Sequence, residues 1–112
     1  MNCTEGPGRH LKEKPLTREA VLRMLAQHRE ELRRRFRVKS LALFGSVARN
    51  EAGPRSDVDI LVEFEGSVGL FTFVQLKMYL ESVLGYPVDL VTWDALRPTM
   101  REHVMEELVY AT

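Results

Sequence analysis

The chain has little cysteine and no long hydrophobic run: Cys3 is the single cysteine among its 112 residues. One cysteine excludes an intrachain disulfide and a metal site built on thiolates. No stretch approaches the ~18 apolar residues that a membrane-spanning helix needs. The first fifteen residues are charged and contain glycine and proline, without the apolar centre of a secretory signal. These absences predict a cytoplasmic protein.

Histidines and repeats are also scarce. His10, His28 and His103 are far apart and lack the close spacing of a histidine metal site. We find no internal repeat and no low-complexity segment. The hydrophobic content of 45% and the charged content of 29% are typical of one small globular domain. We therefore expect a flexible N-terminal lead over residues 1–15 and a single domain over residues 16–112.

The net formal charge is zero, but the charges are unevenly distributed. Residues 1–40 hold eleven Lys and Arg against five Asp and Glu, and residues 41–112 hold the reverse. A basic first half could meet nucleic acid, an acidic partner or the domain's own acidic half. Its densest basic run, over residues 33–37, is interpreted as a solvated helix end, with contact to an acidic partner as the alternative. An acidic second half is expected of a domain that gathers carboxylates for cations.

Apolar periodicity and turn residues predict strands that alternate with helices. Thr17 is the expected N-cap of the first helix, and Gly85 is the expected stop of a later one. An α/β (α+β) fold follows, with a mixed sheet and helices packed mainly on one face. The expected order is helix 17–36, strand 38–44, short helix 46–51, strand 57–64, helix 70–84, strand 88–92, a helical stretch 94–107 with Pro98 as the place of an interruption, and strand 108–110.

Two carboxylates open the second predicted strand. Asp57 and Asp59 are one residue apart, so both project from the same face of the strand. Asp89 lies in the third predicted strand, and a shared sheet would bring it near them. Carboxylate oxygens are ligands that Mg²⁺ prefers, together with substrate phosphates. These three aspartates are therefore candidate metal ligands, with Asp89 also a candidate base for an attacking hydroxyl.

A Gly-Ser pair ends the first predicted strand. Gly45 has no side chain and would let the backbone approach a triphosphate closely. Ser46 could donate its hydroxyl and its amide to phosphate oxygens, at the start of a helix that favours anions. Arg49, one turn later, could pair with phosphate, and Arg55 is a weaker candidate. These residues predict a nucleotide-binding turn.

Each fragment alone has an ordinary explanation. Asp-x-Asp is more often a turn or a solvated strand edge than a metal site, and Gly-Ser alone is a loop. In this order and spacing, function outweighs coincidence. Two further features have two interpretations each. Lys77 either covers the core with its stem or reaches a nucleotide cleft. The apolar residues 68–73 and Trp93 either fill the core or form a partner surface.

The stretch LALFGSVARNEAGPRSDVDILVEF resembles the signature of the nucleotidyltransferase superfamily related to DNA polymerase beta. Within it the chain is most similar to the minimal nucleotidyltransferases (MNT). The likeness covers residues 38–92 well and residues 94–112 loosely, with Asn50 where a glycine is frequent. The family's Gly-Ser, Asp-x-Asp and third acid match Gly45, Ser46, Asp57, Asp59 and Asp89.

The resemblance implies an enzyme that transfers a nucleoside monophosphate, most simply AMP from ATP, to a hydroxyl, with two Mg²⁺ ions. It also implies a partner, because many such domains are antitoxins of HEPN-type ribonuclease toxins, and some add AMP to a tyrosine of the toxin. Membranes and nucleic acid are not required. Two alternatives stay open. One is a non-catalytic binding module that occludes its partner. The other is a transferase that acts on a small-molecule hydroxyl.

Overall fold

The computed structural model describes residues 17–53 and 57–111. The expected lead over residues 1–15, Pro54 and Arg55 lie outside these residues. The elements are α2 (Arg18–Gln27), α3 (Arg29–Phe36), β1 (Val38–Phe44), α4 (Gly45–Ala48), β2 (Val58–Phe64), α5 (Leu70–Leu84), β3 (Val88–Thr92), the 3₁₀ turn η1 (Trp93–Ala95), α6 (Pro98–Glu107) and β4 (Val109–Tyr110).

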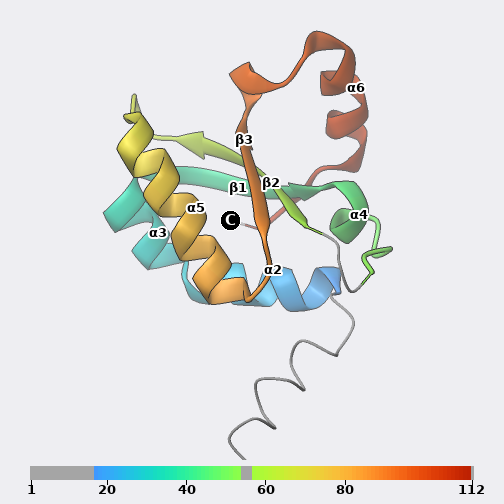
Figure 1. The fold of residues 1–112 in the computed structure, drawn as a ribbon, viewed down its shortest axis with the longest axis horizontal. Coiled ribbons are helices and arrows are strands. Elements are labelled where there is room, and N and C mark those ends of the chain that lie inside the picture. The colour runs from blue at the N-terminus through green and yellow to red at the C-terminus, as the bar shows by residue number, and fades with distance from the viewer. Residues whose placement is uncertain (1–16, 54–56, 112) are drawn as a thin grey trace, which may run out of the picture.

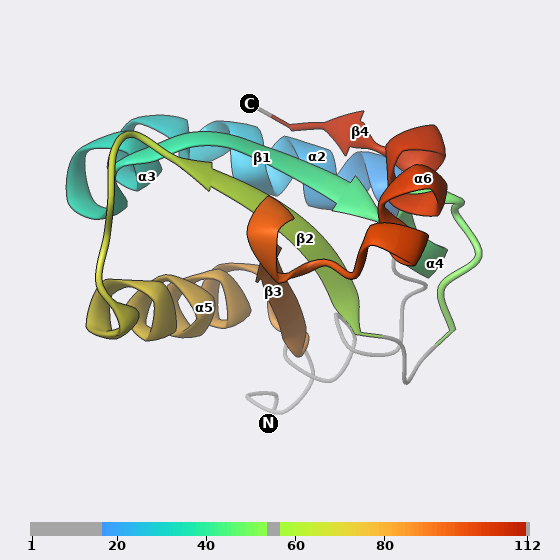
Figure 2. The same ribbon diagram turned by 90° about the horizontal axis from the view of Figure 1, so that it is seen from above.

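The four strands form one mixed sheet in the order β3-β2-β1-β4 (Figure 2). Strand β1 lies antiparallel to both β2 and β4, whereas β2 and β3 run parallel. The parallel pair needs a crossover, and helix α5 supplies it between β2 and β3. Because β2 and β3 are parallel, both strands start at the same end of the sheet, and the predicted carboxylates lie at that end.

Helices α2, α3 and α5 cover one face of the sheet (Figure 1). Each strand turns alternate apolar side chains toward them, so that Val58, Ile60 and Val62 of β2 are almost completely buried. The helices contribute their own apolar stripes to this main core. The helical residues in it include Val21, Leu25, Leu32, Phe36, Leu76, Leu80 and Leu84.

The opposite face of the sheet is covered only in part. A small second cluster joins Phe44 of β1 to Leu96 and Val104, the latter from α6. Helix α6 lies beside α4, at the end of the sheet where β1 finishes (Figures 1 and 2). The predicted arrangement, a mixed sheet with helices mainly on one face, is confirmed, and α6 leaves part of the second face open.

The first predicted helix is wrong in one respect, because residues 17–36 form two helices and not one. The Thr17 hydroxyl accepts a hydrogen bond from the Ala20 amide at 3.2 Å, as expected of an N-cap. The break falls at His28, whose ring nitrogen Nδ1 lies 2.8 Å from the Met24 carbonyl oxygen. The His28 backbone (φ −106°, ψ 16°) leaves helical geometry there. The break changes the direction of the chain while Leu25 and Leu32 stay buried.

The other limits agree closely with prediction, with one exception. Helix α5 and strands β1 and β3 match their predicted bounds. The helical stretch 94–107 divides before Pro98, which becomes the first residue of α6. The short helix predicted over residues 46–51 instead begins at Gly45 and ends at Ala48. It ends early because Asn50 adopts a left-handed backbone (φ 62°), a conformation that glycine adopts readily and asparagine tolerates.

Core filling does not account for all of the apolar residues around position 70. Phe73 packs against the main core, but Leu70 and Phe71 are 77% and 74% exposed. Met78, two turns after Phe71, is also exposed. The outer side of α5 therefore carries an apolar surface, which supports the alternative interpretation as a contact surface. No helix among the described residues is long and apolar enough to cross a bilayer.

Candidate active site

The sheet brings two of the predicted site residues side by side and places a third next to them. Asp59 of β2 pairs in register with Phe44, the last residue of β1, on one side. It pairs with Asp89 of β3 on the other side. Gly45, the first residue of α4, follows Phe44 and lies against Asp59. Asp57 stands immediately before β2 and is exposed. The predicted proximity of Asp89 to the Asp57–Asp59 pair is thus confirmed by the strand register.

Asp59 is the most buried of the three aspartates, and its neighbours are mostly acidic. Burial first, and then the charges of Asp89 and Asp57, raise the pKa of the Asp59 carboxyl to about 6. The Arg49 guanidinium opposes this shift, and Glu107 adds to it. A carboxylate held among like charges is poorly stabilised without a cation. A cation bound at this site would therefore stabilise the charged form of Asp59.

Mg²⁺ is a cation whose ligand preference matches these side chains. Asp57, Asp59 and Asp89 offer hard oxygen donors on one side of the sheet, as Mg²⁺ prefers. Within residues 17–53 and 57–111, however, no three His, Cys, Asp or Glu side chains converge closely enough to hold a metal ion by themselves. The set therefore fits an ion whose remaining ligands are waters and substrate phosphates, which is the usual form of a protein Mg²⁺ site.

Gly45 is in direct contact with Asp59. Its backbone is left-handed (φ 74°), which glycine adopts without strain. A Cβ built on Gly45 would lie 3.0 Å from Cγ of Asp59 and closer still to Oδ2. The residue therefore has to be glycine for two separate reasons, the backbone conformation and the carboxylate against it. Close approach of the Gly45 backbone to a triphosphate stays a prediction, and within the protein the group that lies against Gly45 is the Asp59 carboxylate.

Arg49 lies just after α4, and its guanidinium is tied to two glutamates. Its Nε donates to Glu51 Oε1 at 3.1 Å, and its Nη1 donates to Glu107 Oε2 at 2.7 Å. Both hydrogen bonds raise the pKa of Arg49 above its usual value, Glu51 first. The second oxygen of Glu107 accepts from the Gly45 amide at 3.0 Å. Gly45 and Arg49 are thus brought together around one carboxylate, while Ser46 lies between them in α4, partly buried.

Glu107 is the site residue that sequence reasoning missed. It lies 62 positions after Gly45, in a helix with ordinary surface composition, and belongs to no motif. The turn around Arg49 has a second support that sequence does not reveal. The Arg18 amide donates to Asn50 Oδ1 at 3.0 Å, and the Arg18 guanidinium donates to the Ala48 carbonyl at 3.0 Å. The start of α2 therefore holds the end of α4 in place.

Lys77 does not reach the predicted site. Its amine donates to Glu81 Oε2 at 3.0 Å, one turn along α5. The same Glu81 oxygen accepts from the Val88 amide at the start of β3. Lys77 thus belongs to the contact between α5 and β3, and its prediction as a nucleotide contact has no support.

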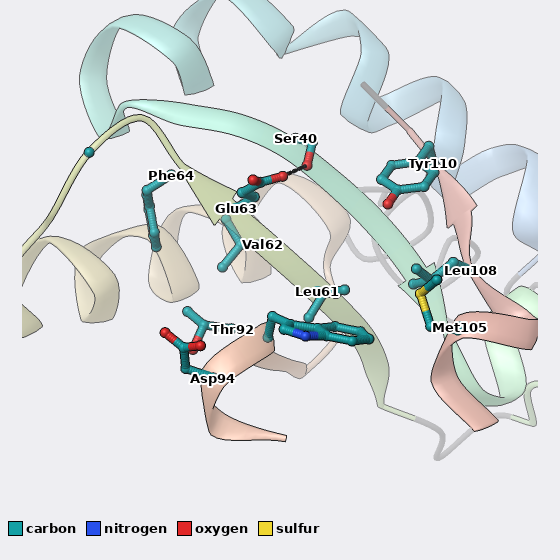
Figure 3. Close-up of a pocket in the computed structure, with 12 residues that line it drawn as sticks. Ser40, Leu61, Val62, Glu63, Phe64, Thr92, Asp94, Met105, Leu108 and Tyr110 are labelled. Atoms are coloured by element: carbon teal, nitrogen blue, oxygen red, sulfur yellow. Dashed lines mark hydrogen bonds between the residues drawn. The ribbon is translucent and has the colours of Figure 1, made fainter. Parts of the chain in front are cut away.

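A groove of about 470 Å³ lies on the open face of the sheet (Figure 3). Leu61, two residues after Asp59, lies at its floor with Glu63 further along β2. Trp93 and Tyr110 are exposed at its sides, 37% and 62% respectively. The groove is open and has both aromatic and acidic walls, and Leu61 connects it along β2 to Asp59.

The raised pKa of Asp59 predicts a pH-dependent stability of the metal-free protein. The native state keeps a proton on Asp59 between pH ~4 and ~6, where an ordinary aspartate has released it. This group therefore stabilises the fold below pH ~4 and loses that contribution as the pH rises to about 6. Asp59→Asn should then be more stable than the native chain at pH 7, by about 1–2 kcal/mol after allowance for solvent screening.

Urea unfolding of both proteins with EDTA, at pH 4 and at pH 7, measures this difference. The gain should be small at pH 4, where Asp59 is protonated in the folded chain and about half protonated in the unfolded chain. An equal gain at both pH values would show that its charge is not the cause. Glu65→Gln, on an exposed loop residue, is the control for removal of a distant carboxylate.

Comparison with known proteins agrees with this geometry. Residues 25–111 match the family described as the nucleotidyltransferase domain. The chain is 45% identical over 95 residues to the protein adenylyltransferase MntA of Thermococcus cleftensis, which covers 85% of this chain and 96% of that protein.

Two solved structures extend the comparison. One, of a provisionally named minimal nucleotidyltransferase, is 41% identical with a TM-score of 0.61 and covers 82% of this chain and 86% of that one. The other is a tri-AMPylated Shewanella oneidensis HEPN toxin in complex with an MNT antitoxin. It is 20% identical with a TM-score of 0.58, covers 81% of this chain and 71% of that one, and shows a shared fold. Because the family match spans most of the chain and the relative is matched over nearly its whole length, the chain belongs to the nucleotidyltransferase domain family and is an enzyme of the minimal type that its sequence resembles.

Proposed function

We propose that the protein transfers AMP from ATP to a hydroxyl group of a partner protein, with Mg²⁺. The observation that carries this proposal is the cluster of Gly45, Asp59 and Asp89, in which Asp59 pairs with Asp89 and lies against Gly45. It puts a close-approach glycine beside two carboxylates, and the pKa of Asp59 is raised there by burial and by acidic neighbours. The family's reaction needs a phosphate-binding turn and metal-binding carboxylates in this arrangement, and the adenylyltransferase relative supports the choice of AMP.

The roles of the residues follow from their positions. Asp57 and Asp59 would hold Mg²⁺, and Asp89 would complete the site next to the attacking hydroxyl. Gly45, Ser46 and Arg49 would bind the β- and γ-phosphates. When bound, two Mg²⁺ ions supply charge that stabilises the attacking and leaving oxygens of an in-line displacement.

The proposed reaction is one displacement at the α-phosphorus of ATP. The hydroxyl oxygen forms a bond to the α-phosphorus, and the bond from that phosphorus to the bridging oxygen breaks. Pyrophosphate leaves, and Asp89 is the proposed acceptor of the hydroxyl proton. Asp89 suits this role because it is exposed at the edge of the sheet and can reach an incoming acceptor.

The proposed partner is a HEPN-type toxin, which the protein would neutralise as its antitoxin in the cytoplasm. Two observations support a protein acceptor. A related fold occurs in a complex of an MNT antitoxin with an AMPylated HEPN toxin. The groove beside the aspartates is open and has aromatic side chains at its edges, as suits a segment of another protein.

Transfer of label from α-labelled ATP tests the proposal. The full chain is incubated with Mg²⁺, with and without the partner encoded beside it, and with GTP, CTP and UTP in parallel. Label on the partner from ATP, lost when EDTA removes Mg²⁺, is the expected result. Label on a small hydroxyl compound without the partner would favour the small-molecule transferase. A stable complex without label from any nucleotide would favour neutralisation by occlusion and would contradict the enzymatic proposal.

A further inference from the structure

Glu107 is bound to two of the groups that the proposed function assigns to phosphate. Its Oε1 accepts from the Gly45 amide at 3.0 Å, and its Oε2 accepts from Arg49 Nη1 at 2.7 Å. One carboxylate therefore bridges an amide donor and a guanidinium donor of the turn. Anionic oxygens of a phosphate group would bind the same pair of donors in the same way.

The position of Glu107 is costly unless these donors hold it. Its charge lies close enough to repel Asp59, in a region that already holds Asp57 and Asp89. An acid placed among acids is stabilised here by Gly45 and Arg49. The Glu107 side chain is 27% exposed and the Arg49 side chain 45% exposed, so an incoming ligand can reach both.

We propose that Glu107 is a resident anion that occupies the phosphate-binding donors of the free protein and that the ATP triphosphate displaces it. This inference rests on the proposed function and adds a residue that sets nucleotide affinity. Each hydrogen bond from Gly45 or Arg49 to phosphate replaces a hydrogen bond to Glu107. The favourable free energy of nucleotide binding is therefore smaller than the phosphate contacts alone would give. Glu107 is thus a positioning residue: it keeps Arg49 turned toward Gly45 until nucleotide arrives.

The displacement has a structural consequence for the groove. Glu107 is the last residue of α6, and the next residue, Leu108, lines the groove together with Met105 of the same helix (Figure 3). Release of Glu107 removes a tie between the end of α6 and α4. Nucleotide binding should therefore loosen the wall of the groove that the acceptor would enter.

Nucleotide affinity of Glu107→Gln tests this inference. Glutamine has the same size but no charge, and it competes less well for Arg49. Calorimetry of the full chain with Mg²⁺ and the non-hydrolysable analogue AMP-PNP should give a Kd about 5- to 10-fold lower for Glu107→Gln than for the native chain. Inorganic triphosphate should show the same improvement, because the competition concerns phosphate. Glu106→Gln, on an exposed neighbour in the same helix, should leave both values unchanged.

Nuclear magnetic resonance supplies a readout that does not depend on affinity. The Gly45 amide resonance should shift on Glu107→Gln in the free protein, and on addition of triphosphate to the native chain. Weaker or equal binding of both ligands by Glu107→Gln would overturn the inference and leave the proposed function standing. Failure of the folded native chain and of Glu107→Gln to bind AMP-PNP or triphosphate would overturn both.

Discussion

Replacement of both Asp57 and Asp59 by asparagine should lower AMP transfer by at least about 10³-fold, without loss of the fold. Asparagine keeps the size of each side chain but removes the charge that would hold Mg²⁺. The free energy of unfolding should not fall, because burial and acidic neighbours raise the pKa of Asp59 to about 6. Its negative charge is therefore unfavourable in the folded protein at pH 7, and asparagine removes that charge. Initial rates of label transfer, at saturating ATP and Mg²⁺, measure the effect.

The control for this double variant is Glu65→Gln, which removes a carboxylate from the exposed loop after β2. It should transfer AMP at the native rate. The melting temperatures of the variants then separate catalysis from folding. Full transfer by the folded Asp57→Asn/Asp59→Asn chain would mean that these carboxylates do not carry the reaction, and the metal assignment would be wrong.

Local signals in the sequence account for most of the fold. Strands β1 and β3 and helix α5 were predictable because turn residues bound them: Gly45 follows β1, and Gly85 (φ 78°) ends α5 shortly before β3. The break at His28 was not predictable, since the apolar stripe continues through it without interruption. At the break the His28 ring packs edge-on against Tyr79 of α5, a contact between positions far apart in the sequence.

The candidate site was predictable in its residues but not in its contacts. Asp59 and Asp89 are 30 positions apart, and their pairing depends on the order of strands β2 and β3. Glu107 gives no signal, because a glutamate near a helix end is common and its bond to Gly45 spans 62 positions. Such contacts depend on where α6 lies against α4, and no local periodicity encodes that placement. Composition likewise cannot tell that Phe71 is exposed while Phe73 packs on the core.

Replacement of Gly45 by alanine should reduce AMP transfer by at least about 10²-fold and destabilise the fold by about 1–2 kcal/mol. Two separate effects combine. The left-handed backbone (φ 74°) is strained for alanine. The added Cβ also lies too close to the Asp59 carboxylate, which must rotate away. A rotated Asp59 side chain no longer lies beside Asp89. The loss of activity should therefore exceed what the loss of stability explains.

Gly85→Ala separates the two effects. Gly85 has a similar backbone conformation (φ 78°), but a Cβ built there meets nothing within 4 Å. It should therefore destabilise the fold through backbone strain alone, by no more than Gly45→Ala does, and leave transfer by the folded fraction unchanged. Urea unfolding gives the stability of both variants, and label transfer at a temperature well below either transition gives their activity. If both alanines reduce transfer equally, strain alone explains the loss, and contact between Gly45 and Asp59 has no special role. If only Gly45→Ala reduces it, the requirement for glycine comes from the carboxylate beside it, which ties the Gly-Ser turn and the metal-binding strand into one site.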